Sequence, residues 1–297
     1  MCPICKVPNA KIRKKGYFAK QATSSQRVQR YQCMECRRSF SEQTGRLSYR
    51  EKKPHENQRL YRLICSGVSQ ARAAAILGIH RITVARKIDK LAHFARRDHY
   101  EWQVKQRKVQ EVQFDEMESS IHTKCKPVTI ALAVNRDTRE IISTAVETIP
   151  AKGKLARIAR KKYGKRPNYA PFAMRRMMES IKRTYPYAKV FSSDQKWTYP
   201  SLVRGYFGEV EHRSTKGRRG CVVGQGELKR GGFDPLFTLN HTAAMVRDNL
   251  KTMSRRTWCT AKRLDRLQDL LDLYVRFHNS FVVQKIRSPT ICGDPIM

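Results

Sequence analysis

Val112-Gln113-Phe114-Asp115-Glu116-Met117 and Lys189-Val190-Phe191-Ser192-Ser193-Asp194 are the two stretches of sequence that decide the fold of this chain. Each is a run of β-branched or aromatic residues that leads to an aspartate. This pattern is typical of a buried strand that places a carboxylate at or near its end. Two carboxylates brought together from separate strands form a site for a divalent cation. Asp115 and Asp194 are therefore predicted ligands of Mg²⁺ or Mn²⁺, and two such ions clamping a phosphate are a common device for cutting and joining nucleic acid strands.

The charge of the chain predicts a polyanionic partner. There are 61 Lys and Arg residues against 25 Asp and Glu, which gives a formal net charge of +36 and a pI near 10.3. The basic residues fall in blocks: residues 1–50 contain twelve with only two acids, and residues 151–178 contain ten with none. A solvated charged surface would not be so one-sided, so we expect binding to the phosphates of double-stranded DNA.

The N-terminal 50 residues contain two CxxC pairs, Cys2 with Cys5 and Cys33 with Cys36. Each pair places two thiolates on one tight turn, and two such turns complete a tetrahedral zinc site in a module too small for a sizeable core. We therefore predict a zinc ribbon over residues 1–50 in which these four cysteines bind structural Zn²⁺. The remaining five cysteines have no paired spacing and are expected to be ordinary thiols.

Residues 51–105 have the helix start and stop signals of a helix-turn-helix. Residues 56–66 form an amphipathic pattern, Ser69 caps a second helix that Gly78 closes, and a longer helix with a basic face begins at Ile79. A plain three-helix packing unit is the alternative interpretation. The basic face favours DNA recognition, with these side chains directed at the major groove: His80, Arg81, Thr83, Arg86 and Lys87.

Residues 106–280 are predicted to form the catalytic core, followed by a C-terminal tail at 281–297. Three strands are expected first, at residues 109–116, 127–135 and 140–149. The later elements are expected in this order: a basic insertion to about residue 171, a helix at 172–184, a strand at 188–193, a helix from Tyr199, and an amphipathic helix at 263–279. This order predicts an α/β fold with a ribonuclease-H-like core, in which the first and fourth strands are neighbours.

Two further segments carry expectations. The basic stretch at residues 212–219, with Arg218 and Arg219, is predicted to be a loop that grips DNA phosphates. Trp197 and Tyr199 are expected to pack in the core or a lid. No run of about 18 apolar residues and no signal-peptide pattern is present, so we expect an intracellular protein without a membrane partner.

The chain resembles bacterial insertion-sequence transposases of the insertion sequence one type. The resemblance lies in the order of these segments: the ribbon, the helix-turn-helix, Phe114-Asp115-Glu116-Met117, Ser193-Asp194-Gln195 and residues 240–279. The resemblance implies a DDE transposase: a ribonuclease-H-like core with three acidic ligands, two Mg²⁺ ions, and transfer of element ends into target DNA. It also implies a homodimer or larger assembly, since two ends are held at once, in the bacterial cytoplasm at the nucleoid.

The chain departs from this family at the third acid, where the family's glutamate falls on Asn240. Asn240 or the adjacent His241 can serve as a neutral ligand or water-orienting group. Alternatively Asp248, eight residues on and about 80° round the same helix, takes the role. The third alternative is an inactive site, in a domesticated DNA-binding regulator that keeps the fold. A metal-dependent nuclease without strand transfer shares the site and differs in product.

Overall fold

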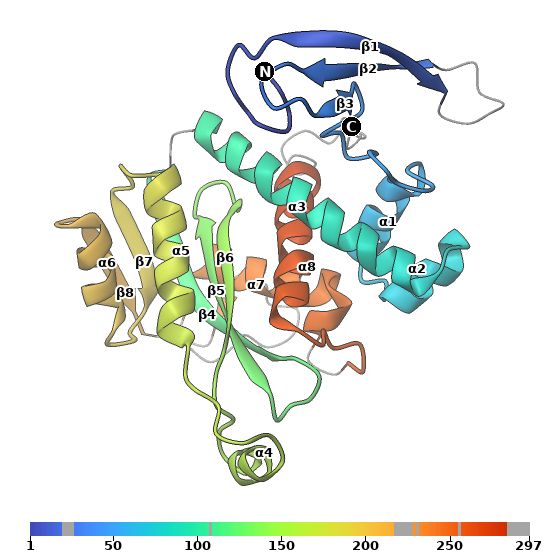
Figure 1. Cartoon of the computed structure of the whole chain (residues 1–297). Helices are drawn as coiled ribbons and strands as arrows, with labels where there is room; N and C mark the ends of the chain where they lie inside the picture. The colour runs from blue at the N-terminus through green and yellow to red at the C-terminus, as the bar shows by residue number, and fades with distance from the viewer. Residues whose placement is uncertain (20–26, 107–108, 217–227, 230–231, 255–256, 284–297) are drawn as a thin grey trace. The chain divides into compact units, whose positions relative to one another are not determined.

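A computed structural model describes residues 1–19, 27–106, 109–216, 228–229, 232–254 and 257–283. It divides into two compact units, an N-terminal unit spanning Met1–Glu56 and a C-terminal unit beginning at Asn57 (Figure 1). No helix among these residues is long and apolar enough to cross a bilayer. The prediction of a loop at residues 212–219 is wrong for residues 212–215, which belong to a strand, β8 (Glu211–Thr215), paired with β7 (Val190–Asp194) in the central sheet. Arg218 and Arg219 of that segment, and the tail beyond residue 283, lie outside the described residues.

The N-terminal unit is a small antiparallel sheet. Its strands lie in the order β1 (Ile12–Ala19), β2 (Arg27–Cys33) and β3 (Ser39–Ser41). A compact apolar cluster in this unit is formed by Cys2, Ala10 and Cys33, with the half-buried cysteines and Phe40 packed against it. Because so little apolar surface is buried, this cluster alone contributes little stability, and the thiols at its centre become structurally important.

Three helices begin the C-terminal region as the sequence predicts: α1 (Glu56–Ile64), α2 (Gln70–Leu77) and α3 (Arg81–Gln106). Ser69 caps α2 by accepting a hydrogen bond from the backbone N–H of Arg72 at 3.3 Å. Gly78 ends α2 in the left-handed conformation with φ 60°, which glycine adopts without a steric penalty. The predicted start of this helix at Ser69 and its predicted end at Gly78 are both confirmed.

A five-stranded mixed sheet forms the centre of the C-terminal unit. The strands lie in the order β6 (Ile141–Thr148), β5 (Pro127–Asn135), β4 (Glu111–Ser120), β7 (Val190–Asp194) and β8 (Glu211–Thr215). β4, β5 and β6 pair antiparallel, whereas β4 pairs with β7, and β7 with β8, in parallel. The predicted α/β architecture with the first and fourth strands side by side is therefore confirmed.

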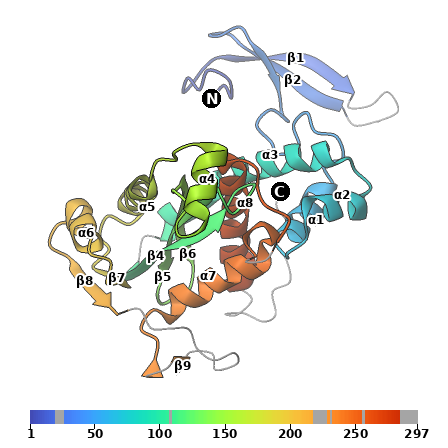
Figure 2. The same cartoon turned by 90° about the horizontal axis from the view of Figure 1, so that it is seen from below.

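Helices cover both faces of this sheet (Figures 1 and 2). α5 (Ala170–Thr184) and α6 (Tyr199–Phe207) pack on the face that carries Phe114 and Phe191. α7 (Phe237–Asn249) lies on the opposite face, against β4 and β5. The basic insertion contains α4 (Leu155–Tyr163), a helix that the sequence analysis did not predict. The remaining short elements are β9 (Leu228–Lys229), β10 (Gly232–Phe233), η1 (Lys251–Met253) and η2 (His278–Val283).

Backbone N–H and carbonyl groups on the outer edge of β6 form hydrogen bonds with side-chain amides. Gln268 of α8 (Leu264–Phe277) accepts a hydrogen bond from the Val146 N–H at 3.1 Å, and Gln103 of α3 donates to the Ile142 carbonyl at 2.7 Å. Asn279 accepts from the Ile141 N–H and donates to the carbonyl of the same residue. These contacts cover an edge that would otherwise offer unpaired backbone groups to another strand.

Glu111 joins the neighbouring strands at the start of β4. Its buried carboxylate accepts hydrogen bonds from the Ser192 hydroxyl on β7 at 2.7 Å, from Arg136 after β5 at 3.1 Å, and from Arg213 on β8 at 3.3 Å. One side chain therefore ties β4 to the two strands that follow it across the sheet and to the hairpin on its other side.

We expect Glu111→Ala to lower the free energy of unfolding of the C-terminal unit by ~2–4 kcal/mol, because it leaves a buried hydroxyl and two guanidinium groups without their shared acceptor. Urea unfolding followed by circular dichroism measures this change. The matched control is Glu118→Ala, which removes an exposed pair with Lys152 at 2.7 Å and is expected to cost less than about 1 kcal/mol. Equal effects of the two substitutions would show that Glu111 does not hold the strands together.

Candidate functional site

The parallel pairing of β4 with β7 brings the two predicted aspartates together. Gln113 is paired with Ser192, and the same register continued by two residues sets Asp115 opposite Asp194. Side chains two residues apart on a strand share a face, so both carboxylates lie on the face covered by α7. The Asp194 charge is among the causes that shift the pKa of Asp115, as expected for neighbouring carboxylates.

The environment of Asp115 disfavours its charged form. Burial is the largest cause, and with repulsion from Asp194 and Glu116 it raises the pKa of Asp115 to about 6, although hydrogen bonds from the Glu116 N–H and the Tyr199 hydroxyl oppose the shift. The Tyr199 hydroxyl donates to Asp115 Oδ1 at 3.2 Å, and burial next to these carboxylates raises the pKa of Tyr199, so it remains a donor. Such an arrangement favours any cation that offsets the repulsion.

Lys196 neutralises the third carboxylate of this region. Its Nζ contacts Glu116 Oε2 at 2.5 Å, and its backbone N–H donates to Asp194 Oδ1 at 3.1 Å. This role of Lys196 was not predicted from the sequence, although its position two residues after Asp194 was a usable signal. The expectation that Trp197 packs internally is wrong, because its side chain is 86% exposed, whereas Tyr199 is buried as expected.

Asn240 is held by a carboxylate that the sequence analysis did not identify. Asp234 is buried just before α7, and its Oδ2 accepts a hydrogen bond from Asn240 Nδ2 at 2.8 Å. Gln113 fixes the start of the same helix, because it donates to the Pro235 carbonyl at 3.0 Å and accepts from the Leu239 N–H at 3.2 Å. The strand that carries Asp115 is thus bonded directly to the helix that carries Asn240.

His241 and Asp248 have their contacts on other elements. The His241 ring packs against Phe237, burial and the nearby Arg139 lower the pKa of His241, and its charge acts on His278 at the end of α8. Adjacent residues on a helix point about 100° apart, so Asn240 and His241 do not share one flank of α7.

Asp248 lies about 12 Å along the helix axis from Asn240. Its backbone carbonyl is close to Gly67, and its charge adds to the effect of burial, the main cause of the raised pKa of Tyr274. The described contacts of Asp248 are therefore with the junction of α1 and α2 and with α8, not with the elements that carry the aspartate pair.

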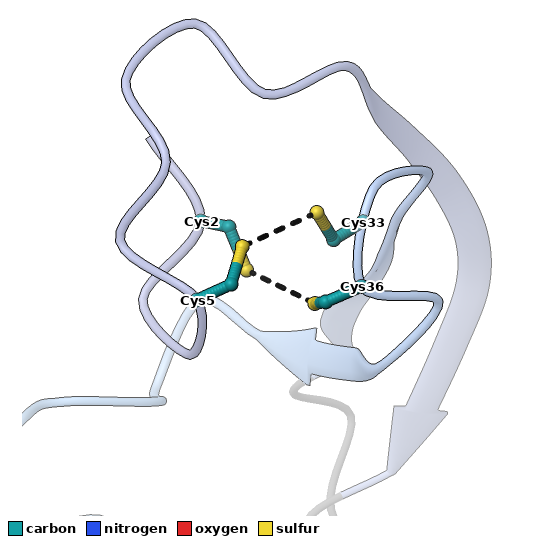
Figure 3. Close-up of side chains that lie close together, drawn as sticks. All are labelled: Cys2, Cys5, Cys33 and Cys36. Carbon is teal, nitrogen blue, oxygen red and sulfur yellow. Dashed lines mark hydrogen bonds between the residues drawn. The ribbon is translucent and has the colours of Figure 1, made fainter.

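The four N-terminal cysteines form a cluster, drawn in Figure 3. Their sulfur atoms all lie within 4.8 Å of one another, with Cys2 Sγ 3.9 Å from Cys36 Sγ and Cys5 Sγ 3.8 Å from Cys33 Sγ. Four sulfurs at ~2.3 Å from a tetrahedral Zn²⁺ are separated by about 3.8 Å, so the cluster fits this ion. Among the described residues, no other group of three or more Asp, Glu, His or Cys ligand atoms is this close.

The electrostatics of the cluster also favour a cation. Burial acts to raise the pKa of the Cys2 thiol, but hydrogen bonds from the backbone of Cys5 and Ile4 outweigh it and lower that pKa to about 7. For Cys5 a hydrogen bond from Val7 lowers the pKa, while burial and the neighbouring thiols raise it to about 11. A thiolate at one position therefore opposes ionisation at the next unless a metal ion compensates it.

The start of α3 exposes most of the predicted recognition residues. His80, Arg81 and Arg86 are exposed, and Thr83 is half-buried. The assignment of Lys87 to the DNA-facing surface is wrong, because its side chain is 3% exposed and donates a hydrogen bond to Asn57 Oδ1 at 2.7 Å. The helical periodicity of the sequence predicted that Lys87 would lie on the exposed face with Arg86. In the structure Lys87 points inward, because this side of α3 packs against α1.

No protein-family model matches the sequence, and no curated protein matches it. The solved structures similar to this chain include the catalytic domain of Mos1 mariner transposase, with 10% identity and a TM-score of 0.30, covering 68% of this chain and 88% of that chain. The Mos1 strand transfer complex has 11% identity and a TM-score of 0.29, covering 82% of this chain and 81% of that chain. Because both TM-scores are this low, the function of this chain has to be inferred from its own residues.

We expect Cys33→Ser to reduce bound zinc and to unfold the N-terminal unit, because three thiolates bind Zn²⁺ less tightly and the unit has little apolar core to replace the metal. Elemental analysis and limited proteolysis measure the two effects, and the cooperative melting of the C-terminal unit should persist. Cys259→Ser, which alters a half-buried thiol outside the cluster, is the control. Full zinc content and a protease-resistant N-terminal unit in Cys33→Ser would contradict the assignment.

Proposed function

We propose that this protein is a DNA transposase that binds the ends of an insertion element and catalyses metal-dependent cleavage and strand transfer. The observation that carries the proposal is the juxtaposition of Asp115 and Asp194 on neighbouring parallel strands. The excess of basic residues and the exposed basic start of α3 support DNA as the substrate. The ribbon and the helix-turn-helix would bind DNA, and the core would perform the chemistry.

Asp115 and Asp194 would hold Mg²⁺ or Mn²⁺ in this site. When bound, the ions supply charge stabilisation for an in-line displacement at phosphorus and lower the pKa of a bound water. Tyr199 donates to Asp115 and orients that carboxylate, while Lys196 neutralises Glu116 and donates its N–H to Asp194. These contacts fix the two ligands before DNA arrives, and such preorganisation is what phosphoryl transfer requires of a protein.

Asn240 is our candidate for the third position. A carboxylate only accepts hydrogen bonds, so the contact with Asp234 requires the amide nitrogen of Asn240 to face Asp234. Its amide oxygen is then directed elsewhere and can bind a cation or orient water. The contacts of His241 and Asp248 make both weaker candidates.

The N-terminal cluster would bind structural Zn²⁺ through Cys2, Cys5, Cys33 and Cys36. Holding two element ends at once requires a homodimer or a larger assembly on double-stranded DNA. We propose that this assembly acts in the bacterial cytoplasm, at the nucleoid.

A catalytically inactive DNA-binding regulator is the second candidate function. It is favoured by one observation, the presence of neutral Asn240 where the resemblance places an acid, since a missing carboxylate weakens binding of divalent cations. A nuclease without strand transfer would use the same two aspartates and is separated from a transposase by its products.

We expect Asp194→Asn to abolish Mg²⁺-dependent cleavage of DNA carrying the element ends, while DNA binding is retained, because the substitution removes a metal ligand but leaves the basic surface. Gel analysis of cleaved and strand-transfer products measures activity, and fluorescence anisotropy measures binding. Wild-type cleavage should increase as the pH rises through about 6, because the Asp115 carboxyl with its raised pKa must lose its proton to bind a cation.

The third position is tested in the same assay. Asn240→Ala should impair cleavage, and the matched control Asp248→Ala should not. Cleavage without strand transfer would identify a nuclease, and an inactive wild type rescued by Asn240→Glu would identify a retired transposase. Strong cleavage by Asp194→Asn would overturn the proposed metal site.

Arg86 and Lys87 provide a matched pair on one helix. Arg86→Ala should weaken binding to the correct DNA end by ~1–3 kcal/mol and relax base preference, because an exposed arginine at this position can pair bidentately with guanine. Lys87→Ala should instead lower the free energy of unfolding by ~1–3 kcal/mol, since it leaves the Asn57 oxygen without its donor. Electrophoretic mobility shifts and thermal unfolding measure the two effects, and the reverse pattern would contradict the orientation of α3.

A further inference from the structure

Trp258 is the most exposed large apolar side chain among the described residues, with an exposed fraction of 100%. It lies after η1, in the segment that leads to α8. Tryptophan is seldom left in water without a function, because its large ring gains more from burial than most side chains do. A fully exposed indole on a basic protein offers a flat apolar face to a ligand, and its surroundings decide whether one fits.

Two hollows meet at Trp258. One, of about 430 Å³, lies between the helix-turn-helix and α8, and its lining includes Arg81, Lys251 and Leu270. The other, of about 770 Å³, lies at the end of β4, and its lining includes Ser120 and Lys124. Thr252, Trp258 and Thr260 line both hollows, so the indole stands on the ridge between them.

The rims of the hollows carry cations available to a polyanion, and the carboxylate in the lining of the second hollow, Glu118, pairs with Lys152 at 2.7 Å. Within the described part of the chain, no carboxylate pairs with Arg81, Lys124 or Lys251. Arg266 in the first hollow differs, because Asp89 and Asp269 contact its guanidinium at 2.8 and 3.1 Å. A strand of DNA that leaves the start of α3 towards β4 would pass unpaired positive charge on each side of Trp258.

The loop that carries Trp258 is anchored. The His122 N–H donates to the Ala261 carbonyl at 2.8 Å, and the Thr260 hydroxyl donates to the His122 carbonyl at 3.3 Å. The Cys259 N–H donates to the Thr257 hydroxyl at 3.0 Å. The two bonds with His122 tie the loop to the turn between β4 and β5, and the Cys259 bond holds the loop internally, so the indole is presented from a supported backbone.

We infer that Trp258 is a stacking platform for an unpaired DNA base at the end of the bound duplex. Every base offers a π-face to an aromatic ring, and basic grooves interrupted by aromatic side chains are the usual means of holding single-stranded nucleic acid. Paired bases inside a duplex offer no free face, so the platform acts on a frayed, flipped or overhanging base. The inference rests on the proposed function for the identity of the ligand as DNA and adds a contact that does not involve Asp115 or Asp194.

The test uses the full chain without divalent metal, so that binding is measured apart from cleavage. The probes are a fully paired duplex and the same duplex with a short single-stranded overhang that contains 2-aminopurine. Wild type should quench the 2-aminopurine and bind the overhang DNA more tightly. Trp258→Ala should lose the quenching and bind the overhang DNA roughly 5- to 100-fold more weakly, with little change on the paired duplex, while Trp258→Phe should retain most of both effects.

Tyr187→Ala is the matched control, because Tyr187 is a highly exposed aromatic residue in the turn before β7 and should leave both probes unaffected. Thermal melting of Trp258→Ala should match wild type, since an exposed ring adds little to the core. Equal weakening on both DNAs, or unchanged quenching in Trp258→Ala, would overturn the inference. Neither result depends on cleavage, so loss of the proposed catalytic function would leave this outcome readable.

Discussion

The parallel pairing of β4 with β7 is the constraint on which the rest of the site depends. A shift of one residue in this register would turn Asp115 and Asp194 to opposite faces of the sheet. Glu111 resists such a shift, since its buried carboxylate contacts Ser192 on β7 and arginines from β8 and the β5–β6 hairpin. The contacts of the buried Glu111 carboxylate thus stabilise the strand pairing that holds Asp115 next to Asp194, although these two carboxylates repel each other.

α3 connects the first helices of the C-terminal unit to the central sheet. It runs for 26 residues, about 39 Å, from the exposed basic residues of the helix-turn-helix to the edge of β6. Arg96 contacts Asp269 at 2.6 Å and Asp272 at 3.2 Å on α8, and Gln103 bonds the backbone of β6. Burial raises the pKa of Asp272 to about 7, so the charge of Arg96 helps to keep it ionised near neutral pH.

Local sequence rules predicted what local forces determine. Ser69 and Gly78 marked the ends of α2, and apolar runs ending in aspartates marked β4 and β7, because capping and strand periodicity are encoded within a few residues. Lys87 and Trp197 were misplaced because tertiary packing decides which side of a helix or loop faces water. Asp234 was missed for the same reason, since its importance comes from a contact with Asn240 that only the folded start of α7 creates.

A neutral Asn240 at the proposed third position would change how the site binds metal. Affinity for divalent cations rises with the number of charged ligands, and here two carboxylates, one with a raised pKa, would be joined by an amide oxygen. The missing negative charge would then come from the DNA phosphate, so that tight metal binding and DNA binding become mutually dependent.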